Sequence, residues 1–214
     1  MATPELIAVT QRGLFATRDA LLARLGLLCR SGWNKIILRE KDLPAAEYAE
    51  LAKEALAVCK PYSTRLILHT FVDEALRLGE DAIHLPLHVA LEQAERLREF
   101  AVVGCSVHSL EQLGQALALR SVAPETRLYV TAGHIFATAC KPGLEPRGLD
   151  FLRKIRAVAC PALVPVYAIG GITPENAARI VGCGADGVCL MSYAMRADES
   201  ALAALCNAIS APKA

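Results

Sequence analysis

The sequence predicts an α/β fold, a (β/α)8 TIM barrel that occupies residues 1–214 as a single domain. Short apolar segments alternate with amphipathic segments eight times along the chain, and no linker or low-complexity tract separates them. The apolar segments are brief and apolar on both faces, as parallel strands covered by helices must be. The alternative is an open doubly wound sheet, but the G-x-G-x-x-G motif expected after its first strand is absent.

Each apolar segment predicts a strand, and each amphipathic segment predicts the helix that follows it. In chain order the predicted strands are residues 7–10, 35–38, 65–68, 82–85, 102–104, 128–130, 165–168 and 187–190. The predicted helices are residues 19–29, 44–59, 72–78, 89–98, 110–120, 149–158, 174–181 and 199–209. Two helix starts carry entry signals, because Ser109 and Gln112 have capping-box spacing and Thr173 offers a capping hydroxyl before Pro174.

Composition and charge exclude several classes of partner. The formal net charge of +1 provides no basic field for nucleic acid, and the 54% of hydrophobic residues are too dispersed to form a membrane span. The N-terminal residues lack the basic start and apolar block of a signal peptide, so we expect a cytoplasmic location. The eight cysteines are scattered without a C-x-x-C pair, which favours reduced and mostly buried thiols.

The loop after the sixth strand is the most informative candidate site, because reactive groups of such a barrel lie on the loops that follow strands. This loop contains His134 and Lys141 in a segment punctuated by glycine and proline. An imidazole titrates near neutrality and can both take and return a proton, so His134 is the candidate acid/base residue. The alternative is a structural histidine bonded to a carbonyl. Cys140, in the same loop, is better explained as a packing thiol.

Two further loops predict a phosphate site. Gly170 and Gly171 follow the seventh strand, directly before the helix that begins at Pro174. Glycine lets backbone amides approach an anion, and the N-terminus of the helix directs positive charge to the same place. Met191 and Ser192 follow the eighth strand and complete the usual phosphate site of a barrel. The alternative is a tight turn that binds nothing.

The remaining polar residues at strand ends allow more than one role. Arg39 and Lys41 follow the second strand and are expected to contact the substrate, with a solvated charge cluster as the alternative. His84 and His88 have the spacing of helical metal ligands, but His84 ends a strand and no third ligand has a matching position. We therefore predict no metal site. Two further histidines either line the mouth of the barrel or are structural; they are His69 and His108.

Five motifs occur in the order seen in the thiamine phosphate synthase superfamily, which the chain resembles over about residues 5–208. The motifs are residues 38–41 (LREK), 107–111 (VHSLE), the loop 133–148, residues 168–174 (AIGGITP) and 184–188 (GADGV). Within this superfamily, synthases join a pyrimidine diphosphate to a thiazole phosphate with magnesium. They carry an Asn-Asp pair after the third strand and an acidic segment after the fourth, where this chain has His69-Thr70 and residues 85–88 (LPLH).

Two other positions also depart from the synthases. Ile37 stands where they place a pyrimidine-binding glutamine, and residues 133–138 (GHIFAT) replace their GPIFPT. The chain thus resembles more closely the thiazole tautomerase (TenI) branch of the superfamily. That family converts an ylidene carboxythiazole phosphate into its aromatic tautomer and uses no cofactor.

The resemblance implies specific roles. His134 corresponds to the acid/base residue, and the amides of Gly170, Gly171, Met191 and Ser192 correspond to the phosphate site, with assistance from Ser106. Lys141 and Arg39 are expected to bind the substrate carboxylate. The expected partner is a phosphorylated thiazole, and barrels of this kind often form homo-oligomers. The open alternatives are a thiamine phosphate synthase and a non-catalytic barrel that binds a phosphate ligand.

Overall fold

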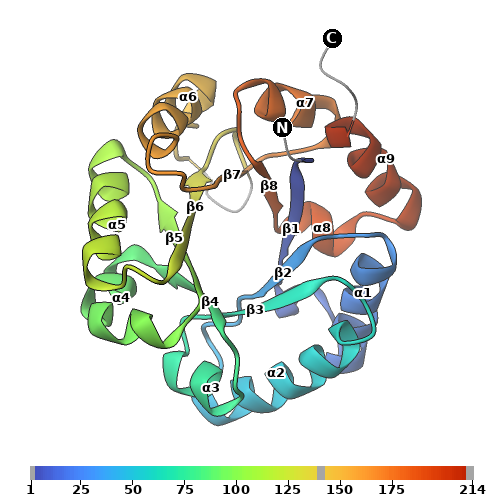
Figure 1. Cartoon of the computed structure of the whole chain (residues 1–214). Coiled ribbons are helices and arrows are strands. Elements are labelled where there is room, and N and C mark those ends of the chain that lie inside the picture. The colour runs from blue at the N-terminus through green and yellow to red at the C-terminus, as the bar shows by residue number, and fades with distance from the viewer. Residues whose placement is uncertain (1–2, 139–142, 211–214) are drawn as a thin grey trace.

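The computed structural model describes residues 3–138 and 143–210, and these residues form a closed barrel of eight parallel strands. The strands follow one another around the barrel in sequence order, and the helices lie outside them (Figure 1). The strands are β1 (Glu5–Val9), β2 (Lys35–Leu38), β3 (Arg65–His69), β4 (Ala82–Pro86), β5 (Val102–Val107), β6 (Arg127–Gly133), β7 (Val166–Ile169) and β8 (Gly187–Leu190). The predicted (β/α)8 barrel is therefore confirmed.

The helices that cover the barrel mostly match the predicted segments. They are α1 (Arg18–Arg30), α2 (Ala45–Cys59), α3 (Val72–Arg77), α4 (Leu87–Glu92), α5 (Leu110–Val122), α6 (Gly148–Ala159), α7 (Pro174–Gly182), α8 (Ser192–Arg196) and α9 (Glu199–Ser210), with 3-10 turns η1 (Arg12–Leu14) and η2 (Ala94–Glu99). The helix predicted over residues 89–98 is wrong in detail, because it splits into α4 and η2 at Gln93, whose φ of −102° and ψ of 18° interrupt the helix. The short helix α8 was not predicted, since five residues are too few to show a period.

Strands β5 and β6 run further than their apolar segments suggested. Ser106 pairs with Thr131 and Val107 pairs with Ala132, so the ladder continues past the point where the sequence becomes polar. Hydrogen bonding to a neighbouring strand maintains the extended conformation there, which apolar periodicity alone cannot reveal. The longer strands bring Ser106 and Gly133 up to the open end of the barrel.

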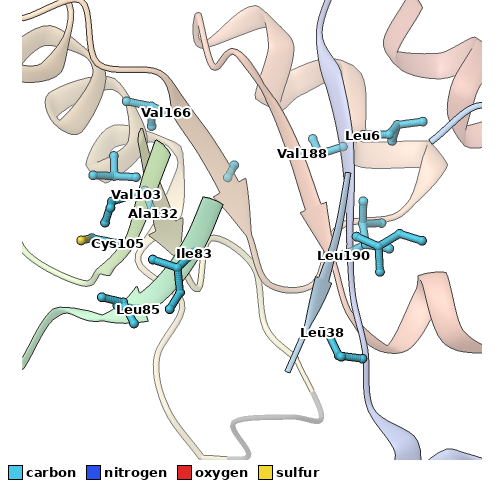
Figure 2. Packing of buried hydrophobic residues seen from close by; sticks show 14 of the residues in the cluster. Leu6, Leu38, Ile83, Leu85, Val103, Cys105, Ala132, Val166, Val188 and Leu190 are labelled. Carbon is cyan, nitrogen blue, oxygen red and sulfur yellow. The ribbon is translucent and has the colours of Figure 1, made fainter. Parts of the chain in front are cut away.

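Side chains alternate between two cores, as a pleated strand requires. Residues that point outward fill the layer between strands and helices, and Figure 2 shows Leu6, Leu38, Ile83, Leu85 and Val188 among them. Residues that point inward form a separate cluster inside the barrel, namely Ile7, Val9, Ile37, Ile67, Ala82, Tyr129, Tyr167 and Cys189. The interior is therefore a packed core, and a ligand can enter only at its mouth.

The end of this interior at which the strands begin is closed by polar contacts. Lys35 forms an ion pair with Glu5, and its Nζ also lies 3.2 Å from the Tyr167 hydroxyl. Both charged residues lie at the first position of their strands. Among the residues described, no helix is long and apolar enough to cross a membrane.

Candidate active site at the mouth of the barrel

A cavity of about 870 Å³ opens where the strands end, and its volume falls in the range of small-molecule sites. Its lining brings together most of the residues that the sequence singled out. These are Arg39, His69, His84, Ser106, His108, His134, Gly170, Gly171, Met191 and Ser192. They come from seven different strand ends, which is the arrangement that a barrel active site requires.

The floor of the cavity is a row of inward-pointing residues on adjacent strands. His69 on β3 pairs in register with His84 on β4, which pairs with Gly104 on β5, which pairs with Tyr129 on β6. The two imidazoles stack with their centroids 5.6 Å apart, and Nδ1 of His84 lies 3.1 Å from the Tyr129 hydroxyl. A Cβ at position 104 would lie 2.4 Å from Nδ1 of His84. A glycine at that position therefore makes room for the contact between His84 and Tyr129.

Both floor histidines are neutral at physiological pH. Burial lowers the pKa of His69 to about 2, with smaller contributions from His84 and from the charges of Arg39 and Lys41. Burial also lowers the pKa of His84 to about 3, and the charge of Arg39 adds to the effect. Desolvation disfavours a buried imidazolium, so these rings serve as hydrogen-bonding groups and do not exchange protons near neutrality.

A hydroxyl network connects the floor to the cavity wall. Nε2 of His84 lies 2.9 Å from Oγ of Ser106, and the Thr131 hydroxyl donates to the same oxygen at 3.1 Å. Ser106 is therefore held from two sides while it lines the cavity. A side chain that is fixed in this way can present a polar group to a ligand at little cost in entropy.

His134 lies directly after β6, with only 6% of its surface exposed. Its Nε2 is 3.4 Å from the carbonyl oxygen of Leu144, which is a long hydrogen bond. Because a carbonyl oxygen only accepts, Nε2 must carry the hydrogen in this contact. Nδ1 is buried and has no hydrogen-bond partner among the residues described. This contact therefore favours the tautomer in which Nδ1 carries a free lone pair, as a general base requires.

The backbone around His134 is held against the turn after β7. The amides of Ile135 and Phe136 donate to the carbonyls of Ile169 and Gly170 at 2.9 and 3.0 Å. A Cβ at Gly170 would lie 2.5 Å from Cβ of His134, and one at Gly171 would lie 2.3 Å from the Ala137 carbonyl. Both glycines also have positive φ, of 104° and 65°. Glycine is required here by the packing of two loops, a reason that the sequence did not suggest.

The turn after β7 also faces the cavity with unoccupied backbone donors. The amides of Gly171 and Ile172 donate to no acceptor within the described parts of the chain, and both residues line the cavity. Helix α7 begins two residues later, where Asn176 accepts from the Thr173 amide at 3.0 Å and donates to the Gly171 carbonyl at 2.9 Å. The helix start is therefore tied to the glycine turn, and its positive end is directed at the cavity.

Cationic side chains complete the site. Arg39 lines the cavity, and no carboxylate lies within ion-pair distance of it in residues 3–138 or 143–210. Arg196 of α8 also lines the cavity, and the sequence analysis did not identify it. It follows the last strand by several residues, on a helix too short to be recognised from periodicity. The only lining carboxylate among the described residues is Asp198, which accepts hydrogen bonds from Ser200 and the Ala201 amide.

Two predicted substrate contacts, Lys41 and Lys141, are not among the described residues that line the cavity. Lys41 is exposed and does not line the cavity, because the segment after β2 turns back toward β1 at the buried Glu40, which accepts from Thr10 and the Arg12 amide at 2.5 and 2.9 Å. Burial raises the pKa of Glu40. Lys141 lies outside the described residues, as does Cys140.

The other histidines have clear positions. His88 is exposed on α4, whereas His84 points into the barrel, so the two do not share a face. Nδ1 of His108 lies 2.6 Å from the carbonyl of Gly133, and this contact braces the strand end that precedes His134. Among the described residues, no group of three or more His, Cys, Asp or Glu side chains could hold a metal ion.

Comparisons with known proteins agree with this geometry. A family model described as thiamine monophosphate synthase matches residues 6–194. A putative thiamine-phosphate synthase 2 of Aquifex aeolicus is 33% identical over 194 residues, which cover 88% of this chain and 96% of that protein. The thiamine-phosphate synthase of Roseiflexus castenholzii is 37% identical over 184 residues, covering 83% and 76% of the two chains.

Among solved structures, thiamine phosphate pyrophosphorylase from Pyrococcus furiosus superposes with a TM-score of 0.76 and 28% identity. The match covers 96% of this chain and 95% of that one. Sequence and structure thus match over nearly the whole barrel, including every strand that contributes to the cavity. The chain belongs to the thiamine monophosphate synthase family.

Proposed function

We propose that this family member is a thiazole tautomerase, which converts an ylidene carboxythiazole ethyl phosphate into its aromatic tautomer. The observation that carries the proposal is the position of His134. Its imidazole lies in the same cavity as the Gly170–Gly171 turn and the Met191–Ser192 strand end. A proton-transfer group and an anion-binding turn on neighbouring strand ends suit a reaction that moves one proton on a phosphorylated ring.

His134 supplies the acid and the base. Nδ1 removes the proton from the ring carbon that bears the carboxylate, and the resulting imidazolium returns a proton to the exocyclic alkene carbon. The electron pair of the broken C–H bond enters the ring, which becomes aromatic as the exocyclic double bond is protonated. Because one group performs both transfers, no second titrating residue is needed, and the neutral His69 and His84 are consistent with this.

The other lining residues bind and orient the substrate. The Gly171 and Ile172 amides and the start of α7 would bind the phosphate, together with Met191 and Ser192. Arg39, which has no carboxylate partner within the described residues, would bind the substrate carboxylate and stabilise the charge that develops on the ring. Ser106, held by His84 and Thr131, would contact the heterocycle. Lys141 is a second candidate for the carboxylate.

A thiamine phosphate synthase is the second candidate, because one relative of this chain is named thiamine-phosphate synthase and another putative thiamine-phosphate synthase 2. Such an enzyme requires magnesium for its diphosphate substrate, and Mg²⁺ prefers carboxylate oxygens. The ends of β3 and β4 provide His69, Thr70 and residues 85–88 (LPLH), none of which is acidic. Asp198 is the sole carboxylate in the described lining, and its hydrogen bonds are local. These residues do not fit a magnesium site, which favours the tautomerase.

The test is a tautomerase assay on the ylidene phosphate in the presence of a chelator. The rate is measured from the increase in absorbance of the aromatic product. We expect turnover with chelator present, and we expect His134→Asn to lower the rate about 10²- to 10⁴-fold while product binding changes little. His88→Asn, on the exposed face of α4, is the matched control and should retain full activity.

Two other outcomes would reject the proposal. Release of pyrophosphate from a pyrimidine diphosphate and a thiazole phosphate, dependent on magnesium, would establish a synthase. Stabilisation by the thiazole phosphate without either reaction would establish a binding protein.

A further inference from the structure

Two cysteines far apart in sequence meet between α1 and α2. Cys29 is the second-last residue of α1 and Cys59 is the last residue of α2, and these helices pack side by side (Figure 1). Their Sγ atoms are 3.7 Å apart, within hydrogen-bond distance for sulfur. Both thiols are nearly buried, with 5% and 3% of their residue surfaces exposed. The two sulfurs would have to approach each other by less than 2 Å to reach the disulfide distance of about 2.05 Å.

A second pocket reaches one member of this pair, Cys59, from outside. It has a volume of about 320 Å³ and is lined by Cys59, Lys60, Thr64, Arg65 and Glu80. These residues lie near the starts of β3 and β4, at the opposite end of the strands from the candidate active site. The pocket shares no lining residue with the active-site cavity, so the thiols can react without a ligand of that cavity being disturbed.

We propose that Cys29 and Cys59 form an oxidation site that closes to an intramolecular disulfide when a small hydroperoxide enters the second pocket. One thiol of the pair, as its thiolate, attacks the terminal peroxide oxygen, the O–O bond breaks, and that cysteine becomes a sulfenic acid as the alcohol or water leaves. The other thiol then attacks the sulfenic sulfur and expels water. Two thiols and one hydroperoxide thus give one disulfide, one alcohol and one water.

The contact between the two sulfurs favours the formation of a thiolate. The hydrogen bond from Cys59 lowers the pKa of Cys29 to about 7, and Thr64 and Arg30 contribute to the same effect. The pKa of Cys59 is raised by its contact with Cys29 and by burial. The close pair therefore carries a thiolate more readily than a cysteine that is buried alone. By contrast, burial raises the pKa of Cys105 to about 12, and burial also raises the pKa of Cys206.

The experiment exposes the reduced full-length chain to hydrogen peroxide, alkylates the remaining thiols, and measures intact mass. We expect two fewer alkylations than in the reduced protein. After digestion with trypsin, a linked pair should join residues 25–30 to residues 54–65, since the bond before Pro61 resists cleavage. Closing a loop of about 30 residues should also raise Tm by about 5–10 °C. Cys29→Ser and Cys59→Ser should each abolish the link, whereas the matched variant Cys206→Ser should retain it.

A second probe covers the case in which either serine variant fails to fold. Phenylarsine oxide binds two neighbouring thiols, so one equivalent should protect both Cys29 and Cys59 from alkylation in the unmodified chain. The proposal is overturned if peroxide oxidises the exposed Cys160 while residues 29 and 59 remain alkylatable, or if the arsenical protects neither thiol.

Discussion

Three histidines of the cavity differ in what surrounds their ring nitrogens, and this difference separates their roles. His84 has both ring nitrogens in contact with hydroxyl groups, and His69 has one nitrogen 2.6 Å from the Thr70 hydroxyl. His134 retains a bare Nδ1 within the described structure. A ring bonded at both nitrogens orients other groups, the His69 ring stays neutral because burial lowers its pKa to about 2, and a ring with a free lone pair can accept a proton. His134 is therefore the only one of the three that we assign to proton transfer.

Gly170 is the residue on which the position of His134 depends. Gly170→Ala would force an alanine into a φ of 104° and place its Cβ 2.5 Å from Cβ of His134. We expect this change to lower the free energy of unfolding by about 2–4 kcal/mol, measured by urea denaturation. Gly114→Ala is the control, because Gly114 lies exposed within α5 with open space around it; it should raise stability by about 0.5–1 kcal/mol. Equal effects of the two variants would contradict this account.

At this scale the sequence predicted some residues and missed others for a physical reason. Position after a strand was sufficient to place Arg39, Ser106 and His134 at the mouth, because every strand of a barrel ends at the same side. The stacking of His69 on His84 depends on the stagger between strands, and the side-chain alternation within one strand does not determine it. The direction of the segment after β2, which leaves Lys41 outside, depends on hydrogen bonds to Thr10, the residue directly after β1.

Two helices begin at the cavity, at the strand ends to which we assign phosphate binding. Helix α7 starts at Pro174, shortly after the Gly170–Gly171 turn, and α8 starts at Ser192, directly after Met191. The sequence predicted the start of α7 from its entry signals. It did not reveal α8, although Ser192 was already assigned to the phosphate site. The side chain of Asn176 connects α7 to the turn that offers the free amides.

Asn176→Ala should therefore weaken anion binding as well as the fold. Loss of its two hydrogen bonds should cost about 1–2 kcal/mol of stability. In the unmodified chain, inorganic phosphate at about ten times its Kd should raise Tm by about 3–5 °C, and the variant should require a higher concentration for the same rise. Asn207→Ala, on an exposed face of α9, should change neither quantity appreciably. A rise in Tm that chloride reproduces at equal ionic strength would instead indicate simple screening.

For the whole molecule, the alternation of apolar and amphipathic segments was sufficient to predict the barrel, because few architectures bury eight parallel strands. Strand lengths were less predictable, since β5 and β6 extend through polar residues by pairing with each other. The expected homo-oligomer stays a prediction. The same barrel interior that positions the cavity also contains the two neutral histidines, so its stability is tied to pH.

Acidification should destabilise the fold through these histidines. Below about pH 6.5 the unfolded chain protonates both rings, while in the fold their pKa values of about 2 and 3 keep them neutral. The unfolded state then binds more protons, so the free energy of unfolding falls as pH falls, by about 1 kcal/mol per histidine between pH 7 and pH 5.5. Glu40, whose pKa is raised, acts in the opposite direction.

Urea denaturation across this range is the appropriate measurement. His69→Asn and His84→Asn should each flatten the dependence on pH, whereas His88→Asn should leave it as it is. Unchanged slopes in all three variants would show that the two rings do not remain neutral in the folded state.

The single tryptophan of the chain, Trp33, is buried just before β2, where its carbonyl accepts from the Thr64 hydroxyl that neighbours the Cys29–Cys59 pair. Its indole thus reports on the base of the barrel. Intrinsic emission should respond to global unfolding and to oxidative quenching nearby, yet stay silent when a substrate enters at the far side. Tryptophan emission can therefore distinguish oxidation near the start of the strands from ligand binding at the mouth of the barrel.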